Sequence, residues 1–145
     1  MQLLGDFYSG IREKVKEEFN SFLSELSLDG LKDITEEYNF VDCENLTMAI
    51  FPSVTSGETV SFSEGSMTVA TTVMLYVNDT YSAESNSLTL SYFDAFIRWI
   101  RENNPLFGEW DSIDGAVLLR MNENCDFNGF AIELKSRINT YMDYS

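Results

Sequence analysis

Histidine, the residue most often used for acid–base and metal chemistry, is missing from this chain. Without histidine the sequence excludes histidine-dependent catalytic triads and most zinc sites. Cys43 lies between Asp42 and Glu44, whose negative charges disfavour the reactive thiolate. Two cysteines in 145 residues are typical of a reducing compartment. We therefore expect Cys43 and Cys125 to be free thiols without a catalytic role.

One run of residues has the spacing of a calcium-binding loop. Positions 1, 3, 5 and 6 of such a loop are occupied by Asn124, Asp126, Asn128 and Gly129. The match fails at position 12, where Lys135 replaces the bidentate glutamate. A β-hairpin turn explains the same residues, because Asn, Asp and Gly fill turns. We therefore expect no metal and no cofactor.

Pairs of carboxylates are the remaining candidates for chemistry. Asp111 with Asp114, or Glu36 with Glu37, could transfer protons or hold a metal ion if they met in a cleft. Nothing in the sequence places them in one, and solvated surface charge is the simpler interpretation. We predict that the protein is not an enzyme and has no small-molecule substrate. A carboxylate-dependent metal enzyme is kept as the third hypothesis.

Acidic charge is the strongest feature of the composition. The chain has 24 acidic and 9 basic residues, a formal net charge of -15. No basic residue occurs between Lys32 and Arg98. Because nucleic-acid affinity depends on Lys and Arg displacing counterions, we expect no binding to DNA or RNA. The excess of acid either serves solubility alone or forms a surface that DNA passes without sticking.

Two stretches have the apolar spacing of amphipathic helices. Residues 6–28 carry apolar side chains at three- and four-residue steps, and Asp29 with Gly30 supplies a stop signal. Residues 82–103 carry a wider, aromatic-rich arc, and Ser82 and Ser85 offer hydroxyls that could cap its start. A further helical turn is possible just after the first stretch, at residues 31–38.

Period-two alternation predicts five strands, at residues 46–51, 58–64, 67–77, 116–121 and 130–139. The last alternates apolar with polar side chains, as expected for a strand with one buried face. The order helix, three strands, helix, two strands predicts a single α/β (α+β) domain over residues 1–145. Its sheet would be mostly antiparallel or mixed, with four to five strands and two long helices packed on one face.

Two segments that carry apolar residues between acids are candidates for a protein interface. Large aromatic residues on loops often anchor interfaces, and Phe107 and Trp110 lie in the predicted loop 106–111. The alternative is that these two side chains cap the core below the second helix. The second segment, residues 53–65, contributes Val60 and Phe62.

The long strand of residues 66–77 leads directly into the helix around residues 92–100, and a closing hairpin runs from residue 126 to the end. An amphipathic helix precedes the first strand. In this layout the chain, mainly over residues 67–144, resembles tail-terminator and related tail-completion proteins of long-tailed bacteriophages. The acid-rich stretch 29–44 departs from the usual pattern. The resemblance implies an α/β fold without a catalytic site and a ring, commonly hexameric, that stops growth of the tail tube and receives the head.

The first hypothesis is therefore a structural assembly protein of a phage or prophage, acting as a ring component at the tail tube or head–tail junction. Its partners would be further copies of itself and other tail or head-completion proteins. The chain lacks a basic segment followed by a long apolar run, so we expect no export and no membrane partner. It would reside in the bacterial cytoplasm during assembly and then in the virion tail. The alternative is an acidic cytosolic adaptor or inhibitor that binds a basic protein.

Overall fold

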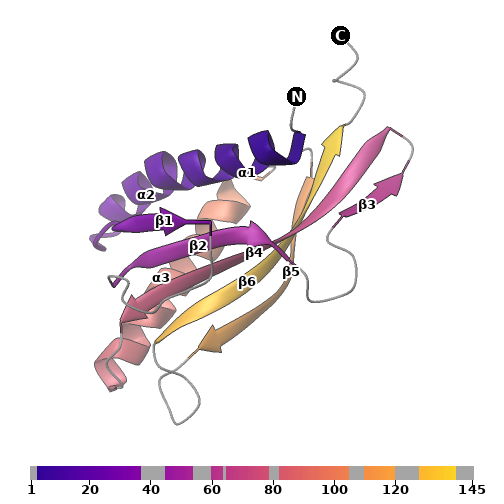
Figure 1. The fold of residues 1–145 in the computed structure, drawn as a ribbon. Helices are drawn as coiled ribbons and strands as arrows, with labels where there is room; N and C mark the ends of the chain where they lie inside the picture. The colour runs from indigo at the N-terminus through magenta and orange to yellow at the C-terminus, as the bar shows by residue number, and fades with distance from the viewer. Residues whose placement is uncertain are drawn as a thin grey trace.

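The computed structural model describes residues 3–36, 45–53, 60–63, 65–78, 82–104, 110–119 and 128–139, and Figure 1 shows their arrangement. The elements are α1 (Leu3–Lys14), the π-helical segment η1 (Val15–Phe19), α2 (Asn20–Glu25), β1 (Asp33–Thr35), β2 (Thr47–Pro52), β3 (Val60–Ser63), β4 (Ser66–Asn78), α3 (Ala83–Glu102), β5 (Trp110–Leu119) and β6 (Asn128–Asn139). The predicted α+β fold class is confirmed. The sheet has six strands, because β1 forms where the sequence suggested a helical turn.

The long strand β4 organises the sheet. The strand order is β1-β2-β4-β6-β5, and β3 also pairs with β4. Strand β6 follows one edge of β4 along its whole length, while β2 and β3 share the other edge, one after the other. Only β1 and β2 run parallel; the other described pairs are antiparallel. The sheet is therefore mixed and mostly antiparallel, as the sequence predicted.

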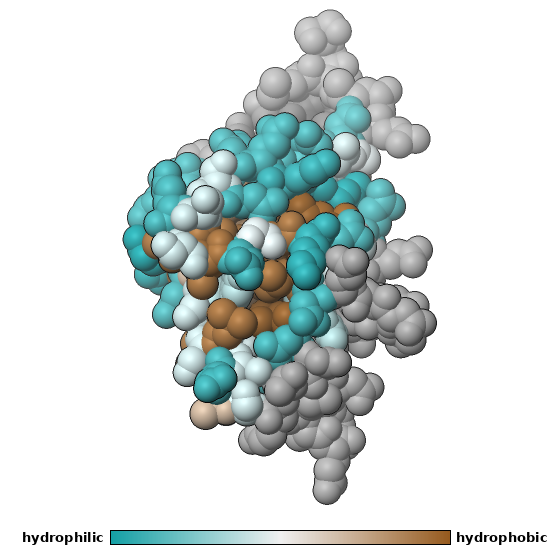
Figure 2. Space-filling view, turned by 90° about the vertical axis from the view of Figure 1, so that its left-hand side faces the viewer, coloured by the Kyte–Doolittle hydropathy of each residue, from teal (hydrophilic) through white to brown (hydrophobic). Residues whose placement is uncertain are grey.

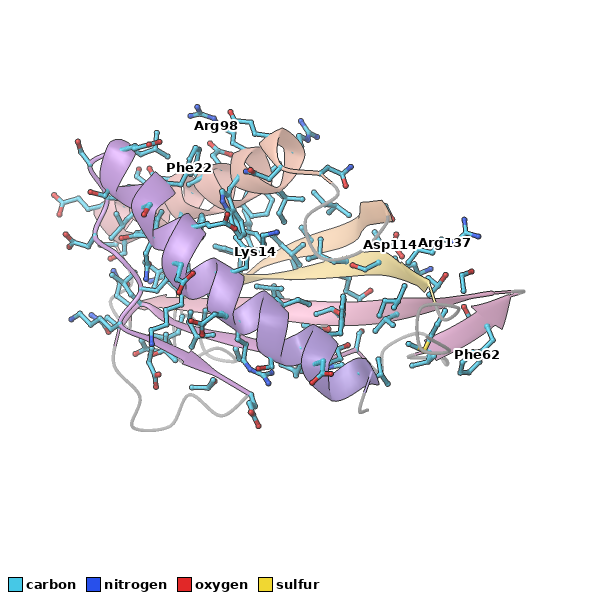
Figure 3. The ribbon with its side chains drawn as sticks, turned by 90° about the horizontal axis from the view of Figure 1, so that it is seen from above. Lys14, Phe22, Phe62, Arg98, Asp114 and Arg137 are labelled. Carbon is cyan, nitrogen blue, oxygen red and sulfur yellow. The ribbon has the colours of Figure 1, made fainter. Side chains whose placement is uncertain are left out.

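Both helical segments cover the same face of the sheet. Phe19 of η1 meets Phe96 of α3 edge to face, with ring centroids 5.2 Å apart. Phe96 in turn packs on Phe130 of β6, with centroids 6.1 Å apart. All three side chains are fully buried. Figure 3, seen from above, shows α1 crossing over the strands. The helices and the strand residues of this face thus share one core, and we call this face the helix-bearing face.

The first helix contains a π-helical turn where its core residues are four apart. Ile11, Val15, Phe19 and Leu23 are all at most 2% exposed. In an α-helix a four-residue step overshoots a full turn by about 40°, so such a series drifts around the helix. The wider turn of η1 takes up that drift. The four side chains therefore remain on the face that contacts the core.

The first helical segment ends before the predicted Asp29–Gly30 stop. Leu26 is the C-cap of α2, and Ser27 follows with φ 61°, in the left-handed region. The amide of Ser27 donates to the carbonyl of Ser24 at 3.1 Å, and the amide of Leu28 donates to the carbonyl of Leu23 at 2.9 Å. These two bonds are the Schellman motif, which usually has glycine at the position of Ser27.

The second helix, α3, begins as the sequence predicted. The hydroxyl oxygen of Ser82 accepts a hydrogen bond from the amide of Ser85 at 3.1 Å and so caps the helix. Further along, the Tyr92 hydroxyl donates to the carbonyl of Asp29 at 2.6 Å. This bond ties α3 to the segment that follows α2. None of the described helices is long and apolar enough to cross a membrane.

Candidate interaction surfaces

Strand β3 lies at an edge of the sheet and exposes a large aromatic ring. Among the described strands it pairs with β4 alone, with Val60 opposite Val69 and Phe62 opposite Met67. Val60 is half-buried, whereas Phe62 is 77% exposed. Figure 3 shows Phe62 at the end of the sheet away from α3. Both predicted interface residues of this segment therefore lie on one short edge strand, and Phe62 is free to meet another molecule.

Strand β5 forms the opposite edge of the sheet. Its segment Gly115–Leu119 pairs with Gly129–Glu133 of β6 and contains no charged residue. Val117 and Leu118 point to opposite faces of the sheet and are 60% and 37% exposed. We call these five residues, 115–119, the β5 edge segment. Alternation predicted a strand at residues 116–121, but not its position at the edge, which depends on its distant partner β6.

An irregularity in β5 precedes the β5 edge segment. The pairing register with β6 shifts between Ile113 and Gly115, which leaves Asp114 as the extra residue of a bulge. The Asp114 carboxylate contacts Lys135 Nζ of β6 at 3.0 Å and accepts a hydrogen bond from the Ser112 hydroxyl at 3.3 Å. The acid that directly precedes the β5 edge segment in the sequence is thus paired with a cation of its own molecule.

The predicted loop 106–111 is partly wrong. Strand β5 begins at Trp110, opposite Arg137 of β6, so Trp110 and Asp111 belong to a strand. Phe107 and the side chain of Trp110 lie outside the described residues. Cys43, Cys125 and Glu37 also lie outside them.

The described part of the chain contains no group of three or more metal-ligating side chains. Of the calcium-like run, Asn128 and Gly129 lie in β6, opposite Asn78 and Tyr76 of β4. The Asn128 side-chain amide donates to Asn78 Oδ1 at 3.2 Å. The other members of that run lie outside the described residues.

The helical side of the molecule is polar, with scattered apolar residues. A surface hollow between α3 and the segment η1–α2 is bordered by Glu17, Glu18 and Glu25. The Arg98 guanidinium lies 5.6 Å from the centre of the Phe22 ring, which also lines this hollow. Figure 2 shows apolar surface among hydrophilic side chains at the end of the molecule that faces left in Figure 1. Apolar side chains among polar ones are ordinary on protein surfaces.

Comparison with known proteins gives no family. The chain matches no protein-family model, and no curated protein matches it significantly. The features of this chain that bear on its function are therefore the two edges of the sheet and the net charge.

Proposed function

We propose that this protein is a structural assembly component of a phage or prophage, a tail-terminator-like subunit that forms a ring at the tail tube or head–tail junction. The observation that carries the proposal is the pair of sheet edges. Phe62 on β3 and Val117 and Leu118 on β5 are large apolar side chains exposed on uncharged strand segments at opposite edges of one sheet.

Such edges are a liability in a molecule that remains alone. An exposed edge strand offers unpaired backbone amides and carbonyls to any other strand, and monomeric proteins usually protect it with charges, proline, a β-bulge, a short strand or a covering loop. The β5 edge segment has neither charge nor proline. Two edges that serve as contacts, one toward each neighbour, explain why both are apolar.

The charge of the chain supports a structure that DNA passes through. At -15, identical subunits repel one another, so their contacts must be made where charge is absent. The remaining acidic surface would keep DNA from sticking to a ring that receives it. The element order also supports the proposal, because a long strand leading into a helix and a closing hairpin is the layout of the tail-terminator resemblance.

In this function the chain performs no chemistry, and its partners are further copies of itself together with other tail or head-completion proteins. The protein would assemble in the bacterial cytoplasm and remain in the virion tail.

Mass in solution, combined with electron microscopy, tests the proposal. Salt screens like charges, so the share of oligomer measured by sedimentation should rise from low to high ionic strength. Negatively stained particles should be rings with a central opening. Val117→Glu, which places charge on the β5 edge segment, should shift the protein toward monomer.

Leu90→Glu is the matched control, because Leu90 is 41% exposed and belongs to α3, not to either edge strand. It should leave the oligomer unchanged. A protein that stays monomeric at every salt and protein concentration would contradict the ring and favour the acidic adaptor or inhibitor.

A further inference from the structure

We infer that neighbouring subunits are joined edge to edge, the β5 edge segment of one copy pairing with β3 of the next, so that the sheet continues from subunit to subunit. This inference rests on the proposed ring function and names the contact that builds the ring. Four features of the described strands support it: charge, strand direction, sidedness and the difference between the two edges.

Charge selects these two segments from the available edges. The β5 edge segment and β3, whose sequence is Val60-Ser61-Phe62-Ser63, are both uncharged. The third edge strand, β1, contains the exposed Asp33 and lies between Lys32 and Glu36. Subunits of net charge -15 repel one another, and a contact between two uncharged strands adds no like charges at the interface itself. Neither segment contains an acidic residue, so neither would attract a basic partner protein. Such a partner would bind to the acidic surface elsewhere on the molecule.

Strand direction fits a repeated contact. Strand β3 is antiparallel to β4, β6 is antiparallel to β4, and β5 is antiparallel to β6. Within one copy β5 and β3 therefore run in opposite directions. If the next copy has the same orientation, its β3 meets β5 antiparallel. Antiparallel pairs tolerate water on one face, which suits a contact at the surface.

The exposed apolar residues Phe62 and Leu118 also lie on the same face of the sheet. Phe62 stands opposite Met67, and Leu118 stands opposite Phe130, which pairs with Leu75 on the same strand as Met67. Because Met67 and Leu75 are eight residues apart on β4, all these side chains lie on the helix-bearing face. In a continued sheet the Phe62 ring of one copy would lie beside Leu118 of the next. Aromatic and aliphatic cross-strand neighbours of this kind stabilise sheets.

The two edges are unlike, and this favours a ring over a dimer. A contact between two different surfaces is head to tail, and such contacts close into rings when the rotation allows. The β5 edge segment pairs with Gly129–Glu133, while β3 lies beside the part of β4 that pairs with Ser136–Asn139. The two contacts therefore lie at opposite ends of the sheet as well as at opposite edges. Strands in a closed sheet are tilted and staggered, and this diagonal placement supplies such a stagger.

Cysteine cross-linking in the full chain tests the contact. Cys43 and Cys125 are first replaced by serine. Phe62→Cys and Leu118→Cys are then introduced separately and together, and the assembled proteins are treated with a short bismaleimide. On a denaturing gel the double variant should give a ladder of dimer, trimer and higher species, whereas each single variant should remain monomeric.

The matched control is the double variant Phe62→Cys with Leu90→Cys, because Leu90 is about as exposed as Leu118 but lies on α3. It should give no ladder. Dimers from Leu118→Cys alone would mean that β5 pairs with β5, which overturns the inference. Oligomers in solution without any ladder would overturn the inference and leave the proposed ring standing. A monomer by sedimentation under all conditions would overturn both.

Discussion

At the scale of single residues, Ser27 is the clearest mismatch between a side chain and its backbone. Its φ of 61° lies in the left-handed region. In residues other than glycine this conformation brings the Cβ too close to the following carbonyl oxygen, which costs roughly 1–2 kcal/mol. The two Schellman hydrogen bonds of Ser27 and Leu28 do not involve its side chain. Ser27→Gly should therefore raise the free energy of unfolding by about 1 kcal/mol, measured by urea denaturation.

Ser24→Gly is the control for that prediction. Ser24 is exposed inside α2, where glycine lowers helix stability by about 0.5 kcal/mol relative to most polar residues. The two serine-to-glycine changes should thus have opposite signs. Equal destabilisation by both would show that the left-handed strain at Ser27 is not released.

Tyr92 gives the fold a dependence on alkaline pH. Burial, with the nearby negative charge of Asp29, raises the pKa of the Tyr92 hydroxyl to about 12 from its ordinary value of 10.0. The folded state thus holds the phenolic proton more tightly than the unfolded state does. Its stabilising contribution is complete below about pH 10 and is lost as the pH rises through about 12.

Urea denaturation of the parent and of Tyr92→Phe between pH 9 and pH 12 measures this contribution. Tyr92→Phe removes the 2.6 Å hydrogen bond to the Asp29 carbonyl and should be less stable at pH 9. The difference between the two proteins should shrink toward pH 12, because only the parent loses a proton at this site. A difference that does not change with pH would contradict the assignment.

At the scale of elements, the role of the π-helical turn η1 can be tested by deleting a single residue from it. Removing the exposed Glu17 would change the spacing of the core series Ile11, Val15, Phe19 and Leu23 to steps of four, three and four residues. An uninterrupted α-helix keeps that spacing on one face. The deletion variant should therefore fold, with a cooperative thermal transition within several degrees of the parent.

Deletion of the exposed Asp94 in α3 is the matched control. The buried residues Thr89, Tyr92, Phe96 and Trp99 already follow steps of three, four and three. Removing one residue turns everything beyond it by about 100°, which takes Phe96 out of the core. This variant should lose its near-ultraviolet circular dichroism. If both deletions unfold the protein, the interpretation of η1 as one extra residue accommodated within an α-helix is wrong.

The elements show where sequence reasoning succeeds. Both helices and the strand β4 were predicted because their patterns are long and local. The three-residue β1 was not, because Asp33–Thr35 is too short to show alternation and exists through its parallel pairing with Thr47–Ala49. Only one of the two candidate interaction surfaces was predicted from the sequence. Phe62 was proposed from its segment, whereas the β5 edge segment needed knowledge of the strand order.

At the scale of the whole molecule, the core between the helices and the sheet should dominate stability. Phe96 is fully buried between Phe19 and Phe130. Phe96→Ala should lower the free energy of unfolding by ~3 to 5 kcal/mol, as large-to-small changes in well-packed cores do. Leu90→Ala, on the exposed side of the same helix, should cost less than ~1 kcal/mol. Equal losses in chemical denaturation would contradict this picture of the core.

The strand order also determines the sequence of events during synthesis. Strand β6 lies between β4 and β5, although the ribosome makes both of those strands first. Until Asn128–Asn139 emerges, β4 lacks its longest partner and β5 has no place in the sheet. Until β6 has been synthesised, the nascent chain therefore exposes the apolar segments of β4 and β5 without the strand that pairs with both. Slow, non-local pairing of this kind exposes a chain to aggregation, and chaperone binding at this stage would protect it.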